Sequence, residues 1–147
     1  MVIKTEQDNT KKDIEVFITY PQKTQFVERL ITVVKSVDTQ VKCFSNGMVN
    51  IVDASEIDYI ESVDNKVIVH CEKNIFEAKG PLYQIYEKLK NIKFIQVNKY
   101  CILNLNKLKE IKQLPNSHLE AVLKNGKQLY VTRKYLTDLK NTLREIQ

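Results

Sequence analysis

Apolar and polar residues change their spacing near residue 40 of this 147-residue chain. Residues 14–20 alternate between apolar and polar side chains and end at Pro21, a pattern that predicts a strand. Over about residues 23–37 apolar side chains recur every three or four positions, which predicts an amphipathic helix with Thr24 as its N-cap. One strand and one helix cannot enclose a core. We therefore expect this appendage, residues 1–40, to dock on the rest of the chain or on a second subunit.

From about residue 41 onward the chain consists of short apolar runs separated by turn signals. Asn-Gly and Asp-Asn pairs tolerate positive φ, so they favour tight hairpin turns. Three such pairs lie between apolar runs and predict three hairpins: Asn46-Gly47 between 41–44 and 49–52, Asp64-Asn65 between 57–63 and 66–71, and Asn125-Gly126 between 119–123 and 129–131.

The remaining elements are short. A strand is expected to end at residues 77–79, and Pro81 suits the first turn of a helix with Leu82 to Leu89 on its apolar face. A last helix is expected from about 134 to 145. The fold class is therefore mainly β with short helices (α+β), divided into residues 1–40 and a domain of residues 41–147.

The net charge of +5 is unevenly distributed. Residues 1–89 carry 11 Lys and Arg against 14 Asp and Glu, whereas residues 90–147 carry 12 against 4. A segment with a balance of +8 is typical of a surface that binds a polyanion such as nucleic acid. A solvated basic face explains the charge equally well.

Catalytic and metal-binding patterns are not found in the sequence. His70 and His118 lie far apart in expected strands, and Asp58, Glu61 and Asp64 are expected to be solvated. Cys43, Cys71 and Cys101 are odd in number and widely spaced, which favours reduced, buried thiols over disulfides or a metal site. We expect no enzyme activity, no cofactor and no metal. We also expect a cytoplasmic location without membrane insertion, since neither a membrane-length apolar run nor a secretory leader is found.

Two polar stretches carry groups suited to DNA. In residues 94–104 apolar flanks surround Gln96, Asn98 and Lys99, which predicts a rigid loop presenting amide and ammonium groups. Amides can pair with adenine, and Lys can reach guanine. Thr132-Arg133-Lys134 precedes the last helix, whose N-terminus favours phosphate. Either stretch could equally be a solvated surface loop.

Three segments together resemble the LytTR DNA-binding domain family. They are Tyr59-Ile60-Glu61-Ser62-Val63-Asp64-Asn65-Lys66, the 94–104 stretch Phe-Ile-Gln-Val-Asn-Lys-Tyr-Cys-Ile-Leu-Asn, and the 132–140 segment that begins Thr-Arg-Lys-Tyr-Leu. They occur in the family's order and spacing over about residues 41–146. The resemblance implies an elongated arrangement of small antiparallel β-sheets whose loops enter successive major grooves of promoter DNA.

The resemblance also implies which side chains face DNA. We expect base contacts from Lys99 and Arg133 and phosphate contacts from Lys66, Lys134 and Lys107. The full expected set is Asn65, Lys66, Gln96, Asn98, Lys99, Lys107, Arg133 and Lys134. Gln96 and Asn98 stand where the family commonly has Arg and His, and Tyr100 replaces its usual Ser. These departures leave the base preference open.

The implied function is that of a bacterial transcription regulator that lacks a phosphoacceptor receiver domain and binds double-stranded DNA at paired repeats. We expect a homodimer, at least on DNA, with Phe26, Leu30, Ile31 and Val34 in the contact. Packing of this helix on its own domain is an equal alternative. A protein–protein or sensory module that keeps the fold without specific DNA binding is the alternative function.

Overall fold

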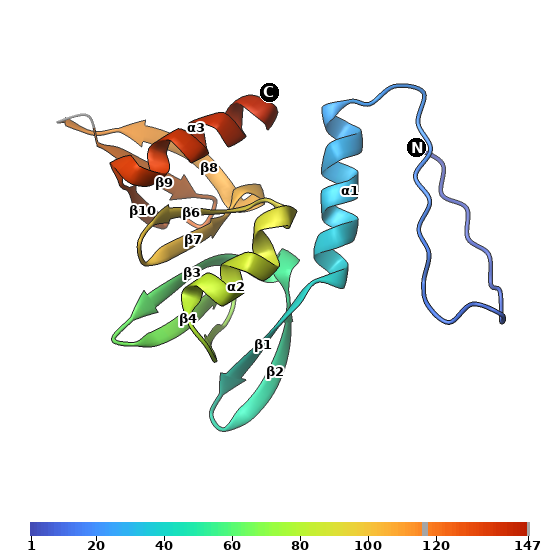
Figure 1. Ribbon diagram of the computed structural model, residues 1–147, viewed down its shortest axis with the longest axis horizontal. Helices are drawn as coiled ribbons and strands as arrows, with labels where there is room; N and C mark the ends of the chain where they lie inside the picture. Colours follow the sequence, from blue (N-terminus) through green and yellow to red (C-terminus); the bar gives the residue numbers. More distant parts are fainter. Residues whose placement is uncertain (116–117, 147) are drawn as a thin grey trace.

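The structure, a computed structural model, describes residues 1–115 and 118–146, with three α-helices and two antiparallel sheets (Figure 1). The helices are α1 (Gln25–Asp38), α2 (Leu82–Leu89) and α3 (Arg133–Ile146). The seven-stranded sheet has the order β2-β1-β5-β4-β3-β7-β6, and the three-stranded sheet has the order β10-β9-β8. The strands are β1 (Gln40–Ser45), β2 (Met48–Asp53), β3 (Ile57–Val63), β4 (Lys66–Cys71), β5 (Ile75–Ala78), β6 (Phe94–Asn98), β7 (Cys101–Asn104), β8 (Leu108–Gln113), β9 (Leu119–Leu123) and β10 (Gln128–Val131). This arrangement confirms the predicted fold class.

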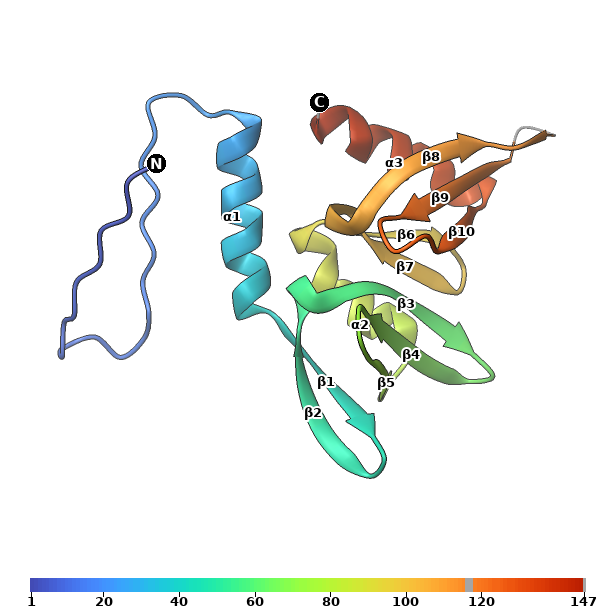
Figure 2. The same cartoon turned by 180° about the vertical axis from the view of Figure 1, so that it is seen from behind.

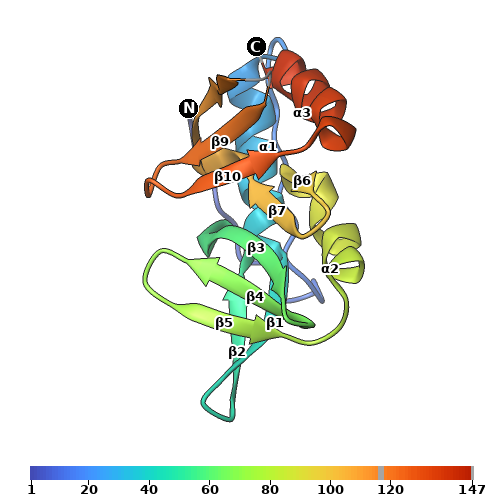
Figure 3. The same cartoon turned by 90° about the vertical axis from the view of Figure 1, so that its left-hand side faces the viewer.

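The larger sheet is covered on both faces where β3, β7 and β6 lie. Alternate side chains of a strand point to opposite faces, so Ile60 and Ile102 enter the core beneath α2, while Tyr59 and Leu103 enter the core shared with β9, β10 and α3. Figure 3 shows α2 and α3 against the sheets. The strands at the junction of the two cores are therefore fixed from both sides.

All three predicted hairpins are present. Asn46 and Gly47 have φ of 51° and 75° in the first turn, and Asp64 and Asn65 have φ of 51° and 63° in the second. In the third, Gly126 has φ of 90° between β9 and β10. The helix over residues 23–37 is confirmed as α1, and the Thr24 hydroxyl accepts from the Val27 N–H as the predicted N-cap.

Several sequence predictions were wrong. Residues 14–20 are extended but pair with no strand in the described part of the chain, because alternation alone does not supply a partner for the backbone. Conversely, β8 was not predicted. Pro81 is the N-cap of α2 rather than part of its first turn, and Arg133 is the first residue of α3 rather than a residue before it. Asp58, expected to be solvated, is only 4% exposed, and His118 lies immediately before β9 rather than within a strand.

Helix α1 and the preceding segment, residues 1–24 (the arm), lie to one side of the domain (Figures 1 and 2). The helix contacts the domain at the 3₁₀ turns η1 (Ala54–Glu56) and η2 (Lys90–Ile92) and at β2. Its buried residues include Thr32 and Ser36, whose hydroxyls donate to backbone carbonyls of the helix itself. The third buried residue of α1 is Val27. None of the helices in the described ranges is long and apolar enough to cross a bilayer.

Candidate nucleic-acid interface

Three turns that are distant in sequence come together at one edge of the domain. They are Asp64–Lys66 between β3 and β4, Asn98–Tyr100 between β6 and β7, and Thr132–Lys134 at the start of α3; we call them the turn cluster. The antiparallel register places the first two together, since Cys101 pairs with Glu61 while Leu103 pairs with Tyr59 farther from the turn. In Figure 1 the turn cluster lies on the side of the domain away from α1.

Backbone hydrogen bonds hold the three turns relative to one another. The Ser62 N–H donates to the Tyr100 carbonyl at 2.8 Å, which joins the first turn to the second. The Thr132 N–H donates to the Val97 carbonyl at 3.0 Å, which joins the second to the third. Because these bonds link segments that are already anchored in the sheets, the turn cluster is a fixed surface rather than three independent loops.

The amide of Asn98 is used inside the protein. Its Nδ2 donates to the Tyr130 carbonyl at 2.8 Å, and its Oδ1 accepts from the Tyr100 N–H at 2.9 Å. Gln96 is half-buried and its Nε2 donates to the Lys99 carbonyl at 3.4 Å. Both residues were expected to face DNA. In this geometry one N–H of each amide holds the turn in place.

Lys99 and Tyr100 project from the tip of the second turn. Lys99 is exposed, and its Nζ lies 5.6 Å from the centroid of the Tyr100 ring. Tyr100 is 58% exposed even though its backbone is bonded on both sides. In the sequence, Tyr100 stands out only because it replaces the usual Ser of the family pattern. Its exposure makes it an additional residue of the candidate interface.

Arg133 and Lys134 occupy the N-terminal turn of α3, and both are exposed. A helix N-terminus carries unpaired N–H groups and partial positive charge, which favours phosphate. Asn65 and Lys66 are exposed in the first turn. Among the residues that the structure describes, Lys66, Lys99, Arg133 and Lys134 form no ion pair with a carboxylate. Their charges are therefore available to an external anion.

Lys107 does not belong to the turn cluster. It ends the 3₁₀ turn η3 (Leu105–Lys107), which follows β7 at the far end of that strand. Its Nζ lies 4.0 Å from the buried Asp58 carboxylate, which also accepts from Asn125 at 3.3 Å. The structure thus separates Lys107 from the other expected phosphate contacts and gives its charge an internal partner.

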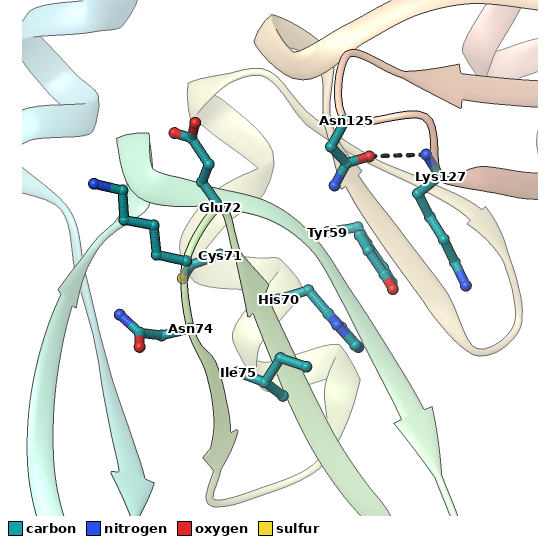
Figure 4. A pocket seen from close by; sticks show the side chains of 9 residues that line it. Tyr59, His70, Cys71, Glu72, Asn74, Ile75, Asn125 and Lys127 are labelled. Carbon is teal, nitrogen blue, oxygen red and sulfur yellow. Dashed lines mark hydrogen bonds between the residues drawn. The ribbon is translucent and has the colours of Figure 1, made fainter.

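A concave region lies at the end of the domain opposite the turn cluster, between the β4–β5 connection and the β9–β10 turn (Figure 4). Its volume is about 390 Å³. Within it His70 stacks on Tyr59 at 4.1 Å, and its Nε2 lies 2.8 Å from Glu61. The described residues contain no group of three or more His, Cys, Asp and Glu side chains that could hold a metal ion.

The cysteines are free and poorly suited to thiolate chemistry. Burial raises the pKa of the Cys43 thiol to about 11 and that of the Cys101 thiol to about 12. Burial, with smaller contributions from Cys43 and nearby carboxylates, raises the pKa of Cys71 to about 12. Because the thiolate is the nucleophile and metal ligand, these residues act as small apolar side chains at neutral pH, buried at Cys43 and Cys101 and half-buried at Cys71.

Comparison with known proteins shows which family contains the part of the chain that forms the three turns. The family model described as the LytTr DNA-binding domain matches residues 47–144. The chain belongs to this family. The match includes all three turns, so the segments that resembled the family in the sequence are those that form the turn cluster.

Individual relatives agree with this membership. The chain is similar to the sensory transduction protein LytT of Bacillus cereus, with 31% identity over 94 residues, and to LytT of Bacillus subtilis, with 31% identity over 93 residues. These matches cover 64% and 63% of the chain but only 38% and 39% of the relatives. The chain therefore matches about two fifths of the length of these curated relatives.

A solved structure shows the same fold. It is the LytTr DNA-binding domain of a methyl-accepting/DNA response regulator from Bacillus cereus, with a TM-score of 0.67 and 24% identity. The similarity covers 71% of this chain and 96% of that domain. The fold of this LytTr domain is thus that of a known DNA-binding domain. The arm and α1 account for much of the part of the chain that the similarity does not cover.

Proposed function

We propose that this LytTr-family chain is a sequence-specific DNA-binding transcription regulator that inserts its turn cluster into successive major grooves. One observation carries the proposal: Lys66, Lys99, Arg133 and Lys134 reach the same edge from three turns, exposed and without a carboxylate partner among the described residues. Membership in the LytTr DNA-binding domain family supports it. The balance of +8 over residues 90–147 supports it as well.

The roles of the residues follow from what each is free to do. Lys99 and Arg133 supply donors for base edges, and Lys66 and Lys134 supply charge for phosphates. Asn65 lies beside Lys66 at the tip of its turn. Asn98 and Gln96 position the second turn through their internal hydrogen bonds. Lys107, paired with Asp58, contributes to the domain rather than to phosphate binding.

The proposed target is promoter DNA with paired repeats, each repeat read by one copy of the chain. The arm and α1 are proposed as a unit separate from the DNA-binding domain of residues 41–147. The location proposed is the cytoplasm, where such DNA lies, and no catalytic step is part of the mechanism.

The test begins with a DNA site selected from random sequence by the full chain. Fluorescence anisotropy then compares that site with a scrambled one for the wild type, Lys99→Ala, Arg133→Ala and Lys73→Ala. Lys73 is an exposed lysine at the far end of the domain and controls for loss of one charge. We expect the first two variants to lose about 1–3 kcal/mol on the selected site. Failure to select any site, or equal losses for all three variants, would favour a module that keeps the fold without specific DNA binding.

A further inference from the structure

Helix α1 leaves part of its apolar side exposed, although Val27 is buried. Thr32 and Ser36 are buried, whereas Phe26, Val33 and Val37 are 57%, 50% and 59% exposed. An amphipathic helix on a single folded chain usually turns its apolar side to the core. Here the small hydroxyl side chains permit close approach to the domain, with their own hydrogen bonds satisfied inside the helix. The apolar side is left for another surface.

The arm carries a second apolar surface next to the first. Ile14 is 87% exposed and Phe17 is 84% exposed. Val16 and Ile18 approach Ile31 and Val34 of α1 around a shallow cavity of about 330 Å³. Residues 15–23 make no backbone hydrogen bond with other described residues. The arm therefore covers only one edge of the apolar side of α1. The backbone N–H and C=O groups of residues 15–23 remain available to pair with another strand.

The exposed apolar residues are concentrated in this part of the chain. Of the 18 strongly exposed large hydrophobic residues in the described structure, 10 lie within residues 1–38. Scattered exposed apolar residues are normal, but a contiguous apolar surface marks an interaction site. We define the N-terminal apolar face as Ile14, Val16, Phe17 and Tyr20 of the arm with Phe26, Val33 and Val37 of α1.

We propose that a second copy of this chain covers the N-terminal apolar face, forming a symmetric dimer in which arm and α1 of one protomer pack on arm and α1 of the other. The face can pack against a copy of itself, because it combines an extended apolar segment, whose backbone is unpaired, with the apolar side of a helix. A twofold interface requires the same patch on both partners. The extended arm can also add as a strand to its counterpart.

The size of the face suits a dimer. A standard interface takes about 800 Å² and 20–30 residues from each partner. The arm and α1 together contain 38 residues. Phe17 and Phe26 alone leave on the order of 200–350 Å² exposed, given that an aromatic side chain buries about 150–250 Å². The five other residues of the face, which are Ile14, Val16, Tyr20, Val33 and Val37, are 43–87% exposed and add to this area.

The test is the mass of the full chain in solution, measured by sedimentation velocity over a wide range of protein concentration. We expect the wild type to dimerise, and both Val33→Glu/Val37→Glu and Phe17→Ser to shift to monomer. Glu suits an exposed helix position, and Phe17 lies in the arm outside both cores. The variants therefore retain the folded domain, which circular dichroism verifies. Val49→Glu/Ile51→Glu changes two similarly exposed residues on the edge strand β2 and serves as the control, which stays dimeric.

Two results would overturn the proposal: a wild type that remains monomeric up to its solubility limit, or a dimer that survives both N-terminal variants. A dimer lost only in the control variant would assign the contact to β2 instead. The outcome is separable from the proposed function. The N-terminal variants are expected to bind a single DNA repeat with wild-type affinity, because they leave the turn cluster unchanged. A wild type that shows no specific DNA binding would refute the proposed function and leave the dimer proposal standing.

Discussion

Asn98 Nδ2 donates to the Tyr130 carbonyl at 2.8 Å, and this bond ties the turn between β6 and β7 to the last strand before α3. The same side chain accepts from the Tyr100 N–H. One amide thereby fixes the shape of the second turn and its distance from the third. The position of Lys99 relative to Arg133 consequently depends on the hydrogen bonds of the Asn98 side chain.

Replacing Asn98 tests this positioning role. Asn98→Ala removes two hydrogen bonds, and since a typical hydrogen bond contributes about 0.5–1.5 kcal/mol, we expect a loss of about 1–3 kcal/mol in the free energy of unfolding. Hydrogen exchange of the Tyr100 amide should rise far more than that of amides in β3. Specific DNA affinity should fall while non-specific affinity is retained, because no charge is lost. Unchanged exchange at Tyr100 would contradict the positioning role.

Lys107 and Lys99 should respond oppositely to the same substitution. Lys107→Ala leaves the buried Asp58 carboxylate with Asn125 alone, so we expect about 1–2 kcal/mol of lost stability in urea unfolding. Its DNA affinity should stay near that of Lys73→Ala. Lys99→Ala should lose DNA affinity with little change in stability. If Lys107→Ala lost as much DNA affinity as Lys99→Ala, Lys107 would belong to the DNA interface after all.

The buried thiols predict a loss of stability at high pH. Their pKa values are raised from 9.0 to about 11 for Cys43 and about 12 for Cys101, so the folded state holds the protons more tightly than the unfolded state. This contribution is complete below pH 9 and is lost as pH rises from 9 toward 12. We expect the urea midpoint to fall over that window, and less so in Cys43→Ala/Cys101→Ala. If the urea midpoint changed with pH in the same way in the wild type and the double variant, the thiols would not be the cause of the loss of stability.

A dimer formed through the N-terminal apolar face has a consequence for DNA. The arm and α1 lie on the side of the chain opposite the turn cluster (Figures 1 and 2), so we expect the two turn clusters of such a dimer to point away from each other. Wild-type protein bound to bead-linked DNA should then retain a second, labelled DNA molecule, whereas Val33→Glu/Val37→Glu should not. Equal retention by the two proteins would show that the dimer does not join separate DNA segments.

The sequence predicted the hairpins well because their turns are locally determined. Asp64 and Asn65 adopt positive φ that few other residue types tolerate, so the turn is specified by two positions. Strand β8 was missed because its buried positions do not alternate. Leu108 and Ile111 are three residues apart, and the register shifts between Leu108 and Glu110. Residues 14–20 show the reverse error, since their alternation was read as a strand although no described strand pairs with them.

The candidate site was predicted in part. Lys99, Arg133, Lys134 and Lys66 were expected from the resemblance to the LytTR family, and the structure brings their turns to one edge. The internal roles of Asn98 and Lys107 could not be predicted, because their partners Tyr130 and Asp58 are 32 and 49 positions away and are brought near only by the packing of the two sheets. The exposure of Tyr100 likewise depends on backbone bonds to Ser62 and Asn98 that the sequence does not reveal.

The most direct test of the central claim is to repeat the selection of DNA sites from random sequence with Lys99→Ala and with Arg133→Ala. If separate turns read separate bases, each variant should relax the preference at a different base pair and leave the rest of the site as in the wild type. Lys134→Ala, which removes a proposed phosphate contact from the same helical turn as Arg133, should weaken binding without changing the selected sequence. Identical selected sites for all four proteins, with only a uniform loss of affinity, would contradict the claim that the turn cluster reads the sequence of DNA.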